Sequence, residues 1–221
     1  MTENGVAGRT VLVAGATSAA GIAVCRALAA GGAHVIAVGS DAGRVSALTD
    51  TVPDVRGVVC DLADLGDVER LAEQIHAHQR IDGLIHLVGG WRGGGGLAGQ
   101  TDEDWDFLER RVLTTLRSTT RVFVDDLSAS DAGRLAIVSS TSVDSPAPGG
   151  ANYATVKSAA ETWVRAIARG FAKTAPAASA TIFVVAALDG LESRLATEVV
   201  GLWDAKRASD PLSRVLLSPD G

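Results

Sequence analysis

Tyr153 and Lys157 stand four residues apart near the predicted start of a helix. That spacing places both side chains on one face of the helix. A phenol has an ordinary pKa near ~10 and transfers protons poorly at neutral pH. A fixed ammonium beside it favours the phenolate and is expected to lower the pKa of the phenol toward ~7. The pair therefore predicts a tunable acid–base group.

Ser140 lies upstream, directly after the apolar run 135–139. Such a run predicts a buried strand, and the stretch with prolines and glycines that follows it predicts a loop. A hydroxyl at the carboxyl end of a strand can meet the tyrosine across a crevice. In order and spacing, Ser140, Tyr153 and Lys157 resemble the serine, tyrosine and lysine of the short-chain dehydrogenase/reductase family.

This resemblance implies a catalytic role for each of the three residues. Tyr153 is expected to donate a proton to the substrate oxygen, and Ser140 to hydrogen-bond the same oxygen. Lys157 is expected to lower the pKa of the tyrosine and to bind the nicotinamide ribose. The implied enzyme is an NAD(P)-dependent short-chain oxidoreductase that transfers a hydride between the cofactor and a carbonyl or imine-like carbon of a small molecule.

The elements that must position these residues alternate between strand-like apolar runs and helix-length patterns along the whole chain. This alternation predicts an α/β fold, with a Rossmann-like, doubly wound, parallel seven-stranded sheet in a three-layer arrangement. Ligands of such sheets bind outside the carboxyl ends of the strands, at the switch point. We predict strands over residues 10–14, 34–38, 55–59, 84–88, 135–139, 181–185 and 214–217.

Length and composition agree with a single dinucleotide-binding and catalytic domain over residues 1–221, since 47% of the residues are hydrophobic. A formal net charge of -6 without a basic cluster argues against nucleic acid or a membrane surface as partner. The longest apolar stretch, residues 177–188, is too short to cross a bilayer, and no secretory pattern opens the chain, so we expect a cytoplasmic protein. Cys25 and Cys60 lack a CysXXCys partner; we predict core thiols and no metal site.

The glycine-containing turn 15–21 follows the first predicted strand and precedes a helix predicted over residues 22–30. Gly15 permits a tight turn, and a helix start offers free N–H groups to a pyrophosphate. Such a turn could also be a plain strand-to-helix connection, but its place in the first βαβ unit favours a dinucleotide. Ala19 stands where the family has its middle glycine. The predicted cofactor residues are Gly15, Thr17, Ser18, Ala19, Ala20, Gly21, Ser40, Asp61, Leu62, Val88 and Gly89, with Tyr153 and Lys157.

The end of the second predicted strand indicates which nicotinamide cofactor is bound. An acidic residue there would favour NAD, and an arginine would favour NADP. Gly39 and Ser40 are neither, Asp41 is expected to cap the next helix, and Arg44 follows one turn later, so we predict NADP or NAD with a weak lean to NADP. Asp61 has two open interpretations: it contacts the adenine amino group, as the resemblance implies, or it starts a helix.

The fourth predicted strand departs from the family, which has Asn-Asn-Ala-Gly where this chain has residues 86–89. We expect His86 to be a hydrogen-bonded packing residue. The loop 89–96 has six glycines, and its Trp91 is expected either to line the substrate site or to lie on a flexible surface loop. This Gly-Gly-Trp sequence resembles the dihydropteridine reductase branch of the family, which makes pteridines candidate substrates.

Two further departures leave a second function open. Val112 replaces the asparagine that holds a water in the family's proton relay, and the Pro-Gly turn after the sixth strand is absent. With Ala19, these changes support a catalytically silent dinucleotide-sensing or scaffold protein, which the intact Ser140, Tyr153 and Lys157 oppose. The predicted helices 105–127 and 152–174 are apolar on more than one face, which predicts a homodimer or homotetramer.

Overall fold

A seven-stranded, fully parallel sheet forms the centre of the computed structural model, which describes residues 5–204 and 210–218. The strand order is β3-β2-β1-β4-β5-β6-β7. The strands are β1 (Thr10–Ala14), β2 (His34–Gly39), β3 (Val55–Val59), β4 (Gly83–His86), β5 (Arg134–Ser140), β6 (Ser179–Val185) and β7 (Leu212–Leu216). The predicted fold class and all seven predicted strands are confirmed, with shifts of at most two residues at their ends.

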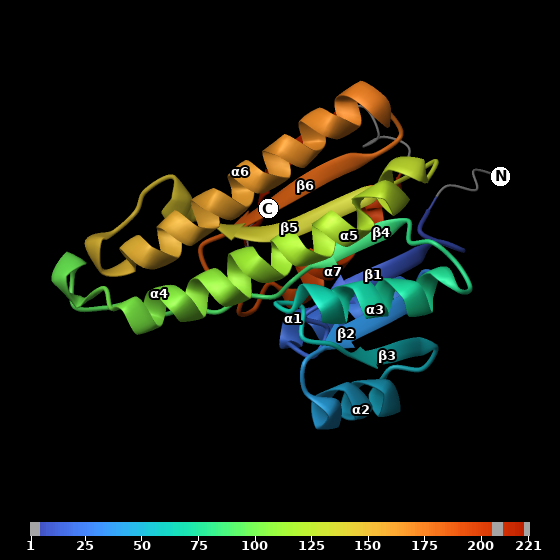
Figure 1. Cartoon of the computed structure of the whole chain (residues 1–221), viewed down its shortest axis with the longest axis horizontal. Helices are drawn as coiled ribbons and strands as arrows, with labels where there is room; N and C mark the ends of the chain where they lie inside the picture. The colour runs from blue at the N-terminus through green and yellow to red at the C-terminus, as the bar shows by residue number, and fades with distance from the viewer. Residues whose placement is uncertain (1–4, 205–209, 219–221) are drawn as a thin grey trace.

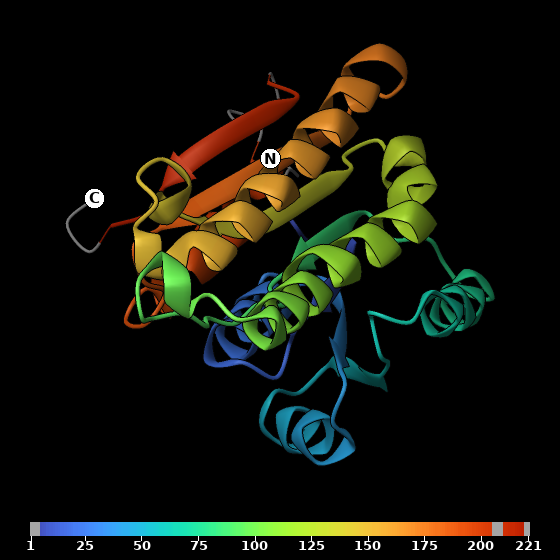
Figure 2. The same ribbon diagram turned by 60° about the vertical axis from the view of Figure 1, so that its left-hand side comes forward.

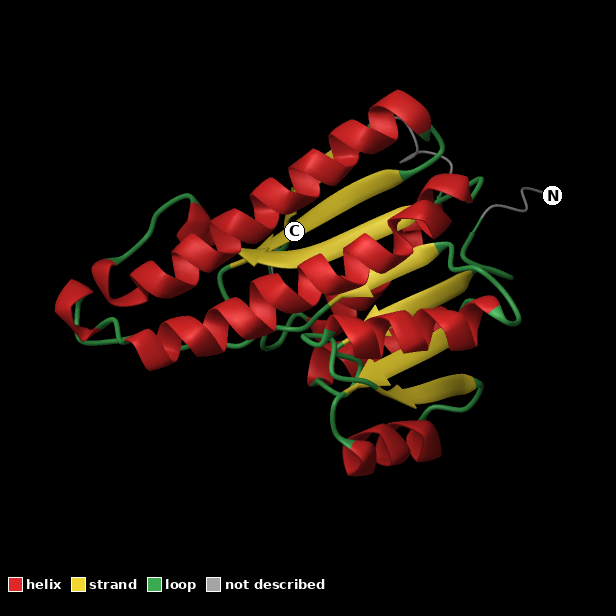
Figure 3. Ribbon diagram, in the orientation of Figure 1, coloured by secondary structure: helices red, strands yellow, loops and turns green. Residues whose placement is uncertain are grey.

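Helices cover both faces of the sheet, as Figures 1 and 3 show. One face packs against α3, α5 and α6, and the other against α1, α2 and α7. Figure 2 shows α5 and α6 running side by side across their face. The helices are α1 (Ala19–Ala30), α2 (Ala42–Thr51), α3 (Leu65–His76), α4 (Asp102–Leu108), α5 (Thr115–Ala129), α6 (Ala151–Thr174) and α7 (Glu192–Val200).

The order in which strands are added to the sheet reverses at β1, with β2 and β3 on one side of it and β4 to β7 on the other, and this switch point between β1 and β4 positions the site. β1 pairs with β2 on one side and with β4 on the other, so that Ala14 lies between Val38 and His86. The loops that leave β1 and β4 diverge there toward opposite faces of the sheet. A crevice at the carboxyl ends of these strands follows from that divergence.

Several predicted helix boundaries are wrong by a turn or less, for identifiable reasons. α1 begins at Ala19 rather than at Ile22, because the Ser18 hydroxyl accepts a hydrogen bond from the N–H of Gly21 at 3.0 Å and caps the helix. The predicted helix 105–127 is interrupted by a π-helical segment, η2 (Glu109–Thr114), between α4 and α5. Such segments are frequent at functional sites.

Both cysteines are buried and free, as predicted. In the described part of the chain, no helix is both long and apolar enough to cross a membrane. The chain start, which entered the prediction of localisation, lies partly outside the described residues.

Candidate active site

Ser140, Tyr153 and Lys157 converge on one cavity of about 560 Å³ at the carboxyl end of the sheet. Ser140 is the last residue of β5, and the other two stand in the first two turns of α6. Ser140 and Lys157 are buried, whereas Tyr153 is half-buried. The structure therefore brings the three predicted catalytic residues together.

Lys157 is a buried cation with one clear backbone partner. Its Nζ donates a hydrogen bond to the carbonyl oxygen of Val138 in β5 at 2.7 Å. Burial lowers the pKa of the Lys157 ammonium from 10.5 to about 8, and the carboxylate of Glu161, one helical turn further along, opposes this fall. The lysine thus ties α6 to β5 beside the cavity.

The pKa of the Tyr153 phenol is raised above its ordinary value, which contradicts the predicted fall toward neutrality. Burial is the main cause, since it disfavours the phenolate, and the neighbouring Ser140 hydroxyl partly opposes it. The Lys157 ammonium lies 5.8 Å from the centroid of the tyrosine ring. At neutral pH Tyr153 therefore holds its proton and can act as an acid.

The Ser140 hydroxyl is held by the turn that follows it. Its Oγ accepts a hydrogen bond from the backbone N–H of Ser142 at 3.1 Å and donates to the Ser142 hydroxyl at the same distance. Ser142 also lines the cavity. Sequence reasoning missed Ser142, although a serine two residues after a strand-end serine is a known pattern for such a local hydrogen bond.

The turn between β1 and α1 leaves no room for side chains at its glycines. Gly15 has a φ of +81°, and a Cβ there would lie 2.9 Å from the backbone of Leu87. A Cβ on Gly21 would lie 2.4 Å from the carbonyl oxygen of Gly15. The two glycines therefore allow a tight turn packed against the end of β4, and α1 starts at this place with its free N–H groups.

A groove of about 510 Å³ lies beside this turn and adjoins the cavity of Tyr153. Of the predicted cofactor residues, Gly15, Thr17, Ser18, Ser40, Asp61, Leu62, Val88 and Gly89 line the groove, while Ala19 and Ala20 line the cavity. Gly21 lines neither, because it packs inside the turn. The groove, together with the free N–H groups at the start of α1, fits an extended dinucleotide.

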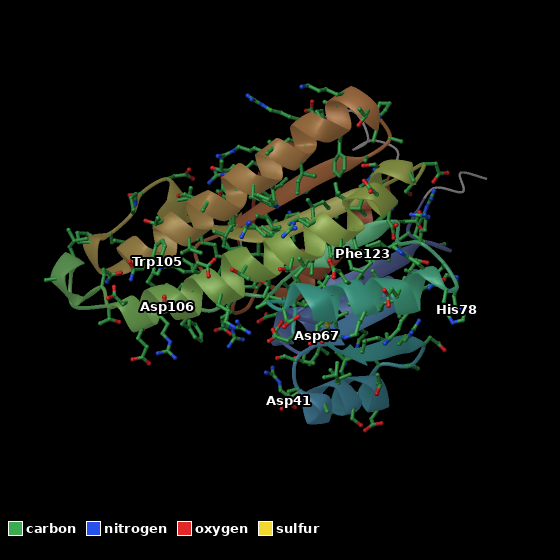
Figure 4. The ribbon with its side chains drawn as sticks, viewed as in Figure 1. Asp41, Asp67, His78, Trp105, Asp106 and Phe123 are labelled. Carbon is green, nitrogen blue, oxygen red and sulfur yellow. The ribbon has the colours of Figure 1, made fainter. Side chains whose placement is uncertain are left out.

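The end of the groove that lies away from Tyr153 carries arginine side chains. The N–H of Arg44 donates to the Asp41 carboxylate at 2.8 Å, which confirms Asp41 as the cap of α2 (Figure 4). The Arg44 guanidinium donates to the carbonyl oxygen of Thr17 at 2.7 Å. Arg110 and Arg111, which sequence reasoning missed, also line the groove. Their place in a helix far along the chain gave no signal for this position.

Asp61 is not the cap of α3, which is Asp64. One Asp61 carboxylate oxygen accepts from the N–H of Ala63 at 3.0 Å, and the other accepts from Arg110 at 2.7 Å. The helix-start interpretation of Asp61 is therefore wrong. Its carboxylate faces the groove, where the resemblance placed the adenine.

His86 is a packing residue, as predicted, and it is electrically neutral. It is buried at the end of β4 and lines the cavity, and its Nε2 lies 3.0 Å from the Thr115 hydroxyl. Because that hydroxyl donates to the carbonyl oxygen of Arg111 at 2.6 Å, we assign Nε2–H as the donor to Thr115. Burial and the Lys157 charge lower the pKa of His86 to about 3. Val112 is buried in η2 and offers no polar group.

The glycine-rich loop forms the outer wall of the cavity. Trp91 lines the cavity but is 66% exposed. The N–H of Gly94 donates to the carbonyl oxygen of Gly149 at 2.8 Å. The Gln100 side chain donates to both these glycines and accepts from the N–H of Asn152, next to Tyr153. Gln100 thereby joins the loop to the start of α6, a link between distant segments that the sequence could not reveal.

Comparisons with known proteins give one family. A family model described as short chain dehydrogenase matches residues 9–190. Dehydrogenase/reductase SDR family member 4 of Homo sapiens is 30% identical over 159 residues, which cover 70% of this chain and 57% of that relative. This chain thus spans little more than half the length of the human protein.

Two further matches cover more of both proteins. An uncharacterized oxidoreductase of Mycobacterium tuberculosis is 33% identical over 211 residues, or 91% of this chain and 82% of the relative. The crystal structure of an actinorhodin polyketide ketoreductase variant with NADPH has a TM-score of 0.83, with 18% identity and coverage of 95% of both chains. The latter likeness concerns the fold.

We predict that Gly21→Ala lowers stability by about 1–3 kcal/mol, because the new methyl group overlaps backbone oxygens that cannot move freely. Gly170→Ala is the matched control, since Gly170 lies in α6 and a Cβ there would meet nothing within 4 Å. The control is expected to stabilise the protein slightly. Urea unfolding of both variants measures the difference; equal free energies of unfolding would contradict the tight turn.

A second prediction concerns pH and Lys157. Because the folded protein lowers the pKa of this lysine from 10.5 to about 8, the unfolded chain binds the proton more tightly between these values. Lys157 therefore disfavours folding below pH 8, and this effect disappears as the pH rises toward 10.5. The free energy of unfolding of the wild type, relative to that of Lys157→Met, should therefore rise between pH 7 and pH 10. The expected rise is at most on the order of 3 kcal/mol. A pH-independent difference would contradict the buried charge.

Proposed function

The chain belongs to the short-chain dehydrogenase family, and from this we propose that it is an NAD(P)-dependent oxidoreductase acting on a carbonyl or imine-like carbon of a small molecule. One observation carries the proposal: Ser140, Tyr153 and Lys157 line a single cavity that adjoins a groove at the switch point. An acid, a hydrogen-bond donor and a cation thus meet beside a site shaped for a dinucleotide.

In the direction of reduction, this chain supplies the proton and the hydrogen bonds. Nicotinamide, when bound, supplies the hydride to the electrophilic carbon. The Tyr153 hydroxyl donates its proton to the substrate oxygen or nitrogen as the electron pair of the double bond moves onto that atom. The Ser140 hydroxyl donates a hydrogen bond to the same atom, and the Lys157 ammonium stabilises the tyrosinate that remains. Solvent then returns a proton to Tyr153.

The residues that would hold the cofactor follow the groove from one end to the other. The backbone of residues 15–21 and the start of α1 would bind the phosphates, with Gly15 and Gly21 allowing the tight turn that places this backbone beside the groove. Asp61 and Leu62 would contact the adenine end, and Val88, Gly89 and Lys157 the nicotinamide riboside. In this role the Lys157 ammonium, which has three N–H donors, would add a contact to the ribose while it keeps the one to Val138.

The substrate side of the cavity favours a small molecule. Part of its wall is the start of the glycine-rich loop, where Trp91 offers a flat aromatic surface. Planar heterocycles such as pteridines remain candidates because they can stack on such a ring. Ala19 and Val112 leave Ser140, Tyr153 and Lys157 together at the cavity, so no observed feature favours the catalytically silent alternative.

We predict that Tyr153→Phe lowers turnover by about 10²- to 10⁴-fold and leaves the affinity for the cofactor nearly unchanged. The ring keeps its shape, but the group that donates the proton is lost. Ser140→Ala should also lower the rate with little effect on the cofactor, whereas Lys157→Ala should weaken both. A screen of pteridines, quinones and ketones that follows nicotinamide absorbance supplies the substrate.

Two outcomes of that screen would count against the proposal. Wild-type turnover by Tyr153→Phe would overturn the catalytic assignment. Cofactor binding by the wild type without turnover of any substrate in the screen would favour the sensing function instead.

We further propose a preference for NADPH over NADH. Ser40 and Arg44 line the groove where β2 ends, and the nearby Asp41 carboxylate is engaged as a helix cap. One hydroxyl and one arginine are expected to give roughly tenfold to hundredfold discrimination in affinity. Arg44→Met should reduce this ratio, and Arg26→Met, an exposed change on α1 outside the groove, should not. NADH affinity equal to or above NADPH affinity, by tryptophan fluorescence titration, would contradict this preference.

We also propose a homodimer or homotetramer. The long helices α5 and α6 form the outer layer of one face, and Trp105 on the adjoining α4 is 37% exposed (Figure 4). Trp163 is partly covered within its own chain, since its Nε1 donates to the Thr120 hydroxyl at 2.9 Å. Sedimentation at micromolar concentration is expected to give a multiple of 22.6 kDa; a monomer alone would contradict this prediction.

A further inference from the structure

Glu161 is a fully buried carboxylate in α6, one helical turn beyond Lys157. Three side chains donate hydrogen bonds to its carboxylate oxygens. The Ser139 hydroxyl donates to one carboxylate oxygen at 2.7 Å, and Arg165 donates to the other at 2.6 Å. Arg214 of β7 approaches both oxygens at 3.3–3.4 Å. A carboxylate without such partners could not remain charged at this depth.

Arg214 differs from Arg165 because it binds a second carboxylate. Its terminal nitrogen donates to Asp144 at 2.7 Å while its Nε faces Glu161. Arg165 belongs to the same helix as Glu161 and binds it in an i, i+4 pair. Arg214 thus joins three segments that are distant in the sequence: β7, the interior of α6 and the turn after β5.

The two carboxylates contact the chain on both sides of Ser140. Glu161 holds Ser139, the residue before it, and Asp144 lies in the turn that follows. The turn has its own hydrogen bonds, since the N–H groups of Asp144 and Ser145 both donate to the carbonyl oxygen of Thr141, at 3.1 and 3.2 Å. Arg214 therefore joins the end of β5, the turn that follows it and α6.

We propose that Arg214 is a positioning residue for Ser140: its guanidinium, bound to Glu161 and Asp144 together, holds the turn after β5 in the place from which the serine hydroxyl faces Tyr153. The effect on turnover rests on the proposed function, whereas the effect on the turn does not. Arg214 does not touch the cavity, so it acts through the backbone of residues 139–144.

A purely stabilising role fits these contacts less well. Asp144 is 59% exposed and Arg214 is 34% exposed, and ion pairs in such positions contribute little to stability. Arg165 already supplies a cation to Glu161, so the charge of that carboxylate stays compensated when Arg214 is removed. The feature that disappears with Arg214 is the link to Asp144. A small displacement of a reacting group can lower a rate by about a hundredfold.

The test compares Arg214→Met with Arg165→Met, a matched loss of one cation from Glu161 that leaves the link to Asp144 intact. Hydrogen–deuterium exchange of the full chain reports the Asp144 and Ser145 amides without any substrate. Arg214→Met should increase their exchange by about tenfold or more, and Arg165→Met should leave it within about twofold of the wild type. Asp144→Asn should reproduce the effect of Arg214→Met, and Arg214→Lys should restore part of the protection.

Kinetics give the second readout, with the substrate found by the screen. Arg214→Met should lower kcat by about 10- to 100-fold with KM for the cofactor nearly unchanged, and a further Asp144→Asn change should add little. Unchanged exchange in the turn, equal exchange in the two arginine variants, or an increase spread evenly over the whole chain would each overturn the proposal. If Arg214→Met does not fold, Asp144→Asn and Arg214→Lys decide by the same criteria. A wild type without turnover would refute the proposed function, and the exchange comparison would still decide the role of Arg214.

Discussion

The buried ammonium of Lys157 is the constraint on which the rest of the site depends. A charge at this depth is tolerated only with partners, and the Val138 carbonyl oxygen and the nearby Glu161 carboxylate provide them. The contact to Val138 fixes α6 against β5, and so sets the position of Tyr153 relative to Ser140. The same charge helps to keep the buried His86 neutral.

The fold provides this arrangement through the carboxyl edge of a parallel sheet. β1, β4 and β5 lie side by side there, and each contributes a different part: the phosphate-binding turn, the cavity wall with His86, and Ser140. Contacts between distant segments complete the edge. Gln100 joins the glycine-rich loop to the start of α6, and Arg214 joins β7 to the turn after β5. The site is thus assembled from the ends of several strands and helices.

The sequence predicted the strands and the three catalytic residues because their signals are local. Apolar runs mark buried strands, and the spacing of Tyr153 and Lys157 is a property of one helix. The direction of the Tyr153 pKa shift was predicted wrongly, since burial depends on the packing of α6 and cannot be read from spacing. Arg110 and Arg214 escaped prediction because each reaches its partner across many residues. The π-helical segment η2 likewise leaves no pattern in an otherwise helical sequence.

The free protein keeps the transferable proton on Tyr153, and Lys157 is the group of the pair that titrates first. Tyr153 is the only tyrosine in the sequence, so protein labelled with ¹³C at the tyrosine ζ carbon gives a single resonance to follow by NMR. We expect this resonance to titrate at a higher pH than that of a free tyrosine, because burial raises the pKa of Tyr153. A titration midpoint clearly below that of a free tyrosine, shifted toward neutral pH, would contradict it.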